Sequence, residues 1–134
     1  MGVILDSSVL IGAERGRLDL EKVLRKLDPS TPVAIASITA SELLHGVERA
    51  DTAERKARRG KFVEGILKEL PVFGFQLGEA RIHARLWAFL HGKGQMIGAH
   101  DLIIAAACLN SDFALATLNR DEFERVPELK LVDL

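Results

Sequence analysis

Several features are scarce or missing in this sequence of 134 residues. It has no tyrosine, 5% aromatic residues and one cysteine, so Cys108 cannot belong to an intramolecular disulfide framework. The few aromatic rings argue against a platform on which single-stranded bases stack. No apolar run approaches the roughly 20 residues of a membrane-spanning helix, and no basic segment precedes an apolar one as in a signal peptide. We therefore expect a cytoplasmic protein without a membrane segment.

Neither sign of charge is in excess, because 18 Lys and Arg residues accompany 19 Asp and Glu residues and the formal net charge is -1. A protein coated with basic groups for nucleic acid would be more positive, so any such contact must come from a local patch. The length of 134 residues and the hydrophobic fraction of 48% are typical of one globular domain with a real core. We expect that domain to span residues 1–134.

Common nucleotide and metal signatures are also missing. The sequence has no Walker-type glycine loop, no dinucleotide fingerprint and no GxSxG elbow. Its four histidines form no HxxxH pattern and no cysteine pair accompanies them, which argues against a zinc site. His100 is next to Asp101, and we expect it to be a loop or surface residue that points elsewhere.

Short apolar segments alternate with helical patterns along the chain. The first segment, Val3 to Leu5, has no polar alternation, which is typical of a strand covered on both faces in a parallel sheet. Further strands are predicted at 33–36, 71–75, 112–118 and 129–132. Helices are predicted near 7–13, 20–27, 37–46, 51–70, 77–92 and 102–109. This order predicts an α/β fold with a doubly wound, mainly parallel sheet of four to five strands flanked by helices.

Two helical segments allow predictions about the core. The stretch 102–109 is apolar on every side, so we expect a buried helix with Cys108 as an inert core thiol. In the preceding helix, Trp87 follows the apolar spacing, and we expect it to pack in the core.

Acidic residues stand at equivalent places in successive strand and helix units. They are Asp6, Glu42, Asp101, and either Asp121 or Glu122. Each has a plain structural explanation: Asp6 could cap a helix, Glu42 could form a capping box with Thr39, and Asp101 could favour a helix N-terminus. These explanations do not account for acids that would all converge on one edge of one sheet.

Convergence of these acids would require a cation. Two carboxylates about 4 Å apart repel by roughly 4 kcal/mol at an effective dielectric constant of 20, so such a group takes up protons or binds cations. Ligand sets made only of oxygen favour Mg²⁺ or Mn²⁺. A cation held in this way suits phosphodiester hydrolysis, because it activates water and neutralises developing charge.

One basic cluster stands out before and within the predicted helix 51–70. It comprises Arg49, Arg55, Lys56, Arg58, Arg59 and Lys61. Two interpretations remain open: a solvated helix face paired with neighbouring acids, or a patch that binds RNA phosphates or a protein partner.

Four segments, in this order and spacing, resemble those of PIN-domain ribonucleases, and among them the VapC-like toxins of toxin–antitoxin pairs. They are Val3–Ser8, Ser37–Gly46, Ile97–Ala106 and Thr117–Phe123. The resemblance covers nearly the whole chain.

The resemblance implies a site and a set of partners. It implies Asp6, Glu42 and Asp101 as catalytic acids that bind Mg²⁺ or Mn²⁺, and Glu122 as the fourth acid, with Asp121 as the alternative. Asn119 and Thr117 would support the same loop. Similar proteins cleave RNA, form homodimers and are silenced by a small antitoxin whose C-terminal segment lies across the active-site groove.

Two other functions fit part of the pattern. A receiver-type regulatory domain also has acids at strand ends, but it needs adjacent acids after the first strand, whereas Ser7 and Ser8 follow Asp6. A non-catalytic interaction module with a PIN-like fold would keep the acids only as helix caps. A lack of Mg²⁺ or Mn²⁺ binding would favour that module.

Overall fold

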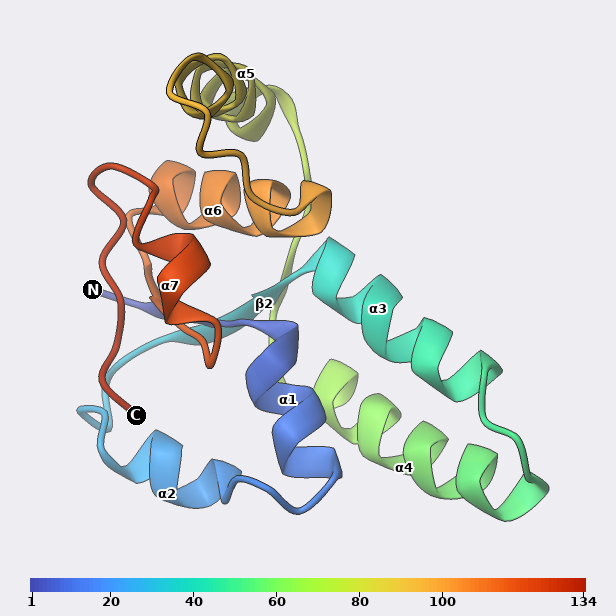
Figure 1. The fold of residues 1–134 in the computed structure, drawn as a ribbon. Coiled ribbons are helices and arrows are strands. Elements are labelled where there is room, and N and C mark those ends of the chain that lie inside the picture. The colour runs from blue at the N-terminus through green and yellow to red at the C-terminus, as the bar shows by residue number, and fades with distance from the viewer.

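The computed structural model describes residues 1–134, and four parallel strands form its central sheet in the order β3-β2-β1-β4 (Figure 1). The strands are β1 (Val3–Leu5), β2 (Val33–Ala36), β3 (Val72–Phe73) and β4 (Ala114–Ala116). The predicted strand at 129–132 is reduced to one bridge between Leu131 and Leu115. The sheet therefore has the predicted parallel class, with four strands and a single added bridge beside β4.

Seven helices flank this sheet in two layers (Figure 1). They are α1 (Ser7–Glu14), α2 (Leu20–Arg25), α3 (Ser37–Glu48), α4 (Ala53–Glu69), α5 (Leu77–Gly92), α6 (Ala99–Ser111) and α7 (Arg120–Phe123). Helices α5, α6 and α7 cover one face, and α1, α3 and α4 pack against the other. None of these helices has the length and apolar character needed to cross a membrane.

The strands alternate between two hydrophobic cores, because successive side chains of a strand point to opposite faces. Ile4 and Leu115 pack in the core under α5, α6 and α7. Val3 and Leu5 pack in the core under α1, α3 and α4. Strand β1 is fully buried on both faces, as the run of apolar residues predicts, and this makes it a rigid support for the residue that follows.

Helix α6 is buried as predicted, but α5 is only partly covered. Cys108 is fully buried, and burial raises the pKa of its thiol to about 12, so the prediction of an inert core thiol is confirmed. The prediction for Trp87 is wrong, because this side chain is 54% exposed. Helix α5 lies at the edge of the molecule on α6 (Figure 1), so Leu86 and Leu90 face inward and Trp87 faces out.

Strand β1 lies between β2 and β4. From β1 the chain continues to β2 and β3 on one side, and it then returns to add β4 on the other side, so the order of the strands reverses between β1 and β4. The backbone N–H of Asp6 donates to the carbonyl of Ala116, 2.9 Å away, which places the ends of these two strands side by side. In open parallel sheets such a switch point at the carboxyl edge is where ligands bind.

Candidate active site

Asp6 follows β1 and is held by side-chain hydroxyl groups. Its side chain is buried, with 2% exposure, and its Oδ2 accepts hydrogen bonds of 2.7 Å from both Ser8 Oγ and Thr117 Oγ1. Asp6 occupies the N-cap position of α1, yet its side chain makes no capping hydrogen bond. The capping explanation is therefore wrong, and the carboxylate is oriented by two hydroxyls instead.

Thr117 and Ser8 tie this carboxylate to the loop after β4. Thr117 is buried and accepts a 2.9 Å hydrogen bond from the backbone N–H of Asn119. Ser8 Oγ accepts a 3.0 Å hydrogen bond from the backbone N–H of Leu118. The position of Asp6 is thus fixed from both sides of the switch point, and the sequence alone gave Ser8 no role.

A second network joins α6, α7 and the loop between α5 and α6. Asn119 Nδ2 donates to Glu122 Oε2 at 2.7 Å and to Asp101 Oδ2 at 3.4 Å. The backbone N–H of Gly98 donates to Glu122 Oε1. Asp121 is exposed and takes no part in these contacts. Of the two acids that the sequence left open, Glu122 therefore lies beside Asp101.

Glu42 reaches the same region from the middle of α3. Its Oε1 is buried without a hydrogen-bond partner, and its Oε2 lies 3.5 Å from His100 Nδ1. The capping box with Thr39 does not form, because the N-cap of α3 is Ala36 and the Thr39 hydroxyl is itself unpartnered. His100 is exposed as expected, but it points toward Glu42, a tertiary contact that the sequence does not reveal.

The four carboxylates influence one another electrostatically. Burial, followed by the charges of Asp6 and Glu122, a hydrogen bond to Glu122 and the charge of Glu42, raises the pKa of Asp101 to about 7. The pKa of Glu122 is lowered, chiefly by the hydrogen bond from the backbone of Gly98. The pKa values of this pair are therefore moved in opposite directions. Burial and the negative charge gathered at this edge of the sheet both favour the protonated form of Asp101.

These acids share an edge, but they do not form a closed metal site. No three Asp, Glu, His or Cys side chains lie close enough together to hold one ion. Three observations nevertheless fit a hard divalent cation: the donors are all carboxylates, Glu42 Oε1 is buried without a partner, and burial together with the neighbouring acids raises the pKa of Asp101 to about 7. Mg²⁺ and Mn²⁺ prefer oxygen ligands of this kind.

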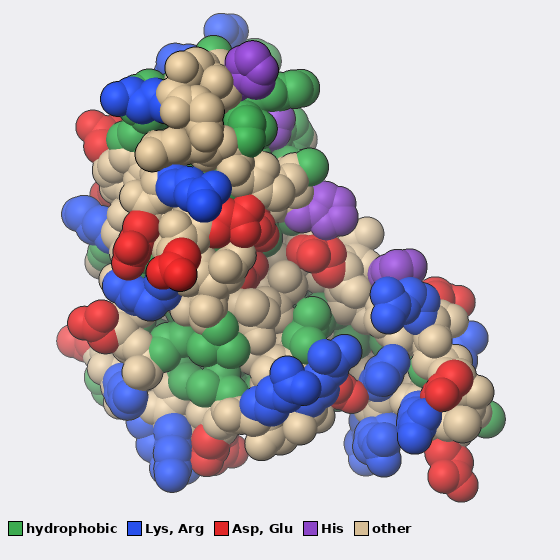
Figure 2. Space-filling model, in the orientation of Figure 1, with side chains coloured by type: hydrophobic (Ala, Val, Ile, Leu, Met, Phe, Trp, Pro, Cys, Tyr) green, Lys and Arg blue, Asp and Glu red, His purple; other side chains and the backbone are tan.

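The basic cluster is divided between paired and free side chains. Arg55 Nη1 donates to both oxygens of Asp51 at 2.7 and 2.8 Å, and Lys56 lies 3.7 Å from Glu48. These two fit the solvated-face interpretation. The three cations without an ion pair are Arg49, Arg58 and Lys61. Figure 2 shows one face of the molecule in the orientation of Figure 1. Acidic side chains lie near the centre of this face, and Lys and Arg side chains lie below and to the right of them.

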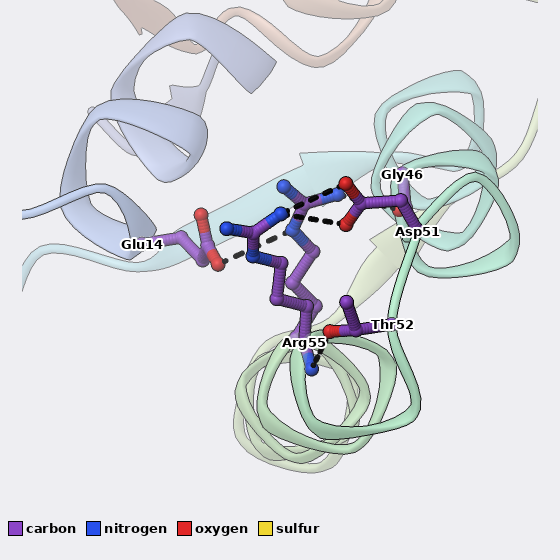
Figure 3. A network of polar contacts seen from close by, with 6 residues as sticks. Glu14, Gly46, Asp51, Thr52 and Arg55 are labelled. Atoms are coloured by element: carbon purple, nitrogen blue, oxygen red, sulfur yellow. Dashed lines mark hydrogen bonds and ion pairs between the residues drawn. The ribbon is translucent and has the colours of Figure 1, made fainter.

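Arg59, the remaining member of the basic cluster, contacts two other helices. Its Nε lies 3.7 Å from Glu14 Oε1, and its Nη1 donates to the carbonyl oxygen of Gly46 at 3.1 Å. This side chain of α4 therefore links α1 to the end of α3. Figure 3 shows Glu14 and Gly46 facing the same corner of α4, beside the pair of Asp51 and Arg55.

With this fold and this acidic edge described, comparison with known proteins defines the class. The family model of the PIN domain matches residues 3–129, so the chain belongs to the PIN-domain family. Ribonuclease VapC of Rickettsia bellii is 31% identical over 132 residues, which cover 98% of this chain and 96% of the relative. Among PIN-domain proteins, the chain is thus similar to VapC along nearly its whole length.

Solved structures agree with that assignment. VapBC2 from Rickettsia felis, bound to a DNA fragment from the promoter, matches with a TM-score of 0.90 and 27% identity over 100% of this chain and 99% of the other. VapBC-5 from Mycobacterium tuberculosis, a member of the VapBC family of toxin–antitoxin systems, matches with a TM-score of 0.81 and 26% identity over 100% of both chains. The resemblance and the fold class predicted from the sequence are confirmed.

Proposed function

We propose that the chain is a Mg²⁺- or Mn²⁺-dependent endoribonuclease that hydrolyses RNA phosphodiester bonds and serves as the toxin of a type II toxin–antitoxin pair. One observation carries the proposal: four carboxylates from four segments face one edge of the sheet, where burial and the charges of the other three raise the pKa of Asp101 to about 7. Similarity to a protein named ribonuclease VapC over 98% of this chain supports the choice of RNA.

The four acids would contribute to cation binding in different ways, according to how each side chain is held. Asp6 supplies a fixed oxygen ligand, because Ser8 and Thr117 orient its carboxylate. Asp101, Glu42 and Glu122 supply further oxygens from helices. When bound, the cation stabilises negative charge on the phosphodiester transition state and lowers the pKa of water.

Two steps fall to the protein itself before cleavage. Asp101 must lose its proton to act as an ionised ligand, and Glu122 must keep its orientation through Gly98 and Asn119. The side chain of Glu42 stays 28% exposed, and we expect the RNA strand to approach the acids from this side, over α3.

A chelation experiment tests this function. Cleavage of single-stranded RNA should require Mg²⁺ or Mn²⁺, stop in excess EDTA and return when the cation is restored. The variant Glu122→Gln should lower the rate by about tenfold, since a second acid near the cation is lost. The matched control Asp121→Asn, which changes the neighbouring exposed acid, should leave the rate unchanged. Cleavage that persists in EDTA would refute the metal-dependent mechanism.

The acidic edge also indicates how a protein inhibitor would bind. The acidic edge would accept a cationic segment of an antitoxin, and a segment seated there would exclude RNA. The related VapBC-5 belongs to a family of toxin–antitoxin systems, which supports a protein inhibitor. Cleavage should be lost when the cognate antitoxin is added in equal amount and should return when the antitoxin is degraded.

A homodimer completes the proposal. The outer face of α5 exposes Leu77 at 65% and Trp87 at 54%, and the rings of Phe75 and Trp87 both contact His83 edge-on, at 5.4 and 5.8 Å between centroids. An apolar face of this kind on a small protein marks an interface, and a two-fold pair buries the same face on both copies. Analytical ultracentrifugation should show a dimer that Trp87→Lys dissociates.

A further inference from the structure

His100 lies at the acidic edge, but the chemistry described above gives it no role. It is the second residue of α6 and directly precedes Asp101. Helix α6 begins close to α3 (Figure 1), and His100 Nδ1 lies 3.5 Å from Glu42 Oε2. The other three histidines of the chain make no such contact with a carboxylate. His100 is therefore the one histidine placed against an acid.

The two carboxylate oxygens of Glu42 have different surroundings. Oε2 lies beside the imidazole of His100, whereas Oε1 is buried and has no hydrogen-bond partner. A buried oxygen without a partner is rare in a native protein, and a bound cation would supply what it lacks. One oxygen of Glu42 thus has a protein partner, and the other is available to a ligand.

Glu42 also differs from the other acids in what restrains it. Hydroxyl groups hold Asp6, and a side-chain amide and a backbone N–H hold Glu122. Glu42 has no comparable set of donors, and the polar group next to its carboxylate is His100. A long side chain loses conformational freedom when it is fixed, so a restraint that exists before binding makes binding more favourable.

The same contact relates Glu42 to the next acid along α6. Because His100 and Asp101 are consecutive, a restraint on Glu42 by His100 also sets its position relative to Asp101. The pKa of Asp101 is raised chiefly by burial, and the charge of Glu42 contributes. The carboxylates of α3 and α6 therefore already influence each other across the space between the two helices.

We infer that His100 is a positioning residue of the acidic site, which holds Glu42 Oε2 through an N–H at Nδ1 and so presents Oε1 to the divalent cation. This inference rests on the proposed function, because it concerns the same cation. The role needs only a hydrogen on Nδ1, which the protonated ring and one neutral tautomer both carry. His100 touches neither the reacting atoms nor the cation.

The test measures cation binding in the absence of RNA. Mn²⁺ is titrated by calorimetry at pH 7 onto protein freed of any partner. His100→Phe keeps an aromatic ring but removes the donor, and it should raise the Kd for Mn²⁺ about tenfold. His100→Asn should bind Mn²⁺ nearly as tightly as wild type, because its amide N–H₂ can replace the donor at Nδ1. The control His91→Phe alters an exposed histidine of α5 and should leave the Kd unchanged.

A double-mutant cycle shows whether His100 acts through Glu42. Glu42→Gln keeps one side-chain oxygen and should weaken Mn²⁺ binding, and His100→Phe should then add little to this loss, because the carboxylate on which it acts is gone. A loss of about tenfold from His100→Phe in both backgrounds would overturn the inference, and so would equally weak binding in His100→Asn and His100→Phe.

Three further outcomes separate this inference from its neighbours. If Mn²⁺ does not bind to wild type, the metal-dependent mechanism fails and this inference fails with it. If wild type and His100→Phe bind Mn²⁺ equally, this inference alone is overturned and the nuclease proposal stands. If His100→Phe raises the KM for RNA and leaves the Kd for Mn²⁺ unchanged, His100 contacts RNA instead of positioning Glu42, and the inference is again overturned.

Discussion

Asp6 and Glu42 face the same edge of the sheet, but the protein holds them in opposite ways. Asp6 is buried at the end of a central strand, and two hydroxyl groups fix one of its oxygens. Glu42 extends from a helix, and its Oε1 has no partner. Within the proposed function, the difference makes Asp6 the pre-oriented ligand, whereas Glu42 would find its partner only when the cation binds. The predictions below test this contrast.

The largest effect should follow from removal of the charge on the fixed acid. Asp6→Asn keeps the shape of the side chain but weakens its hold on a cation, and metal ions contribute several kcal/mol to stabilising such transition states. We expect RNA cleavage to fall by about a thousandfold or more. Circular dichroism should show an unchanged fold. Full activity in this variant would show that Asp6 is not the anchor.

The hydroxyl groups around Asp6 should matter next. Thr117→Val removes a donor to Asp6 Oδ2 and leaves the buried volume nearly unchanged. Loss of such an orienting group typically lowers activity by about 10- to 100-fold. Asp6 Oδ2 keeps its hydrogen bond from Ser8, so the loss of one hydrogen bond to this carboxylate should lower the unfolding free energy by about 1 to 3 kcal/mol. Thr31→Val, far from the site in sequence and free of side-chain hydrogen bonds, serves as the control. Equal rates in both variants would contradict the anchoring role.

The charge shared among the acids around Asp6 should appear as a pH dependence of stability. The pKa of Asp101 is raised from 3.8 to about 7 in the folded protein, so between these values the folded state keeps a proton that the unfolded state has lost. Stability of the metal-free protein should therefore fall as pH rises from about 4 to about 7. Asp101→Asn should remove this dependence and gain about 2 kcal/mol at pH 8, after allowance for solvent at a partly exposed site.

Urea unfolding in EDTA at pH 5, 6.5 and 8 measures this difference. If wild type and Asp101→Asn show parallel pH profiles, the acids do not share excess charge. The proposal that Asp6 and its neighbours form one acidic site would then lose its electrostatic basis.

The smallest effects should come from the basic cluster. Arg58→Gln and Lys61→Gln remove cations without an ion pair, and each should raise KM about twofold at low salt if RNA phosphates approach α4. Arg55→Gln removes a cation already paired with Asp51 and should change KM less. High salt should abolish both effects. KM values that are equal in all three variants and independent of salt would favour the solvated-face interpretation.

Much of the fold and of the acidic edge could be predicted from the sequence, for a physical reason. Asp6 ends an uninterrupted apolar strand, and parallel strands bring their carboxyl ends to one edge, so local patterns place it without further information. Glu42 follows from the same rule, because α3 begins directly after β2. Asp101 does not, because it lies at the start of α6, which follows α5 and no strand. Trp87 could not be placed, because the helical spacing of a residue in the core and of a residue on an exposed apolar face is identical.

Other parts of the site depend on tertiary contacts that no local pattern encodes. The approach of His100 to Glu42 joins two helices far apart in the chain. The support of Asp6 by Thr117 joins residues 111 positions apart. The contacts of Arg59 with Glu14 and with the carbonyl of Gly46 require three helices in their final arrangement. The sequence predicts which acids gather at this edge, and the structure shows how differently each is held.

The most direct test of the central claim is calorimetric titration of the protein, freed of any partner, with Mn²⁺ at pH 7 in buffers of different ionisation enthalpy. If the acids around Asp6 share a cation, Mn²⁺ should bind to wild type and release close to half a proton per protein, because Asp101 has a pKa of about 7 and must ionise. Binding should be lost in Asp6→Asn. No binding to wild type, or equal binding to Asp6→Asn, would contradict the claim.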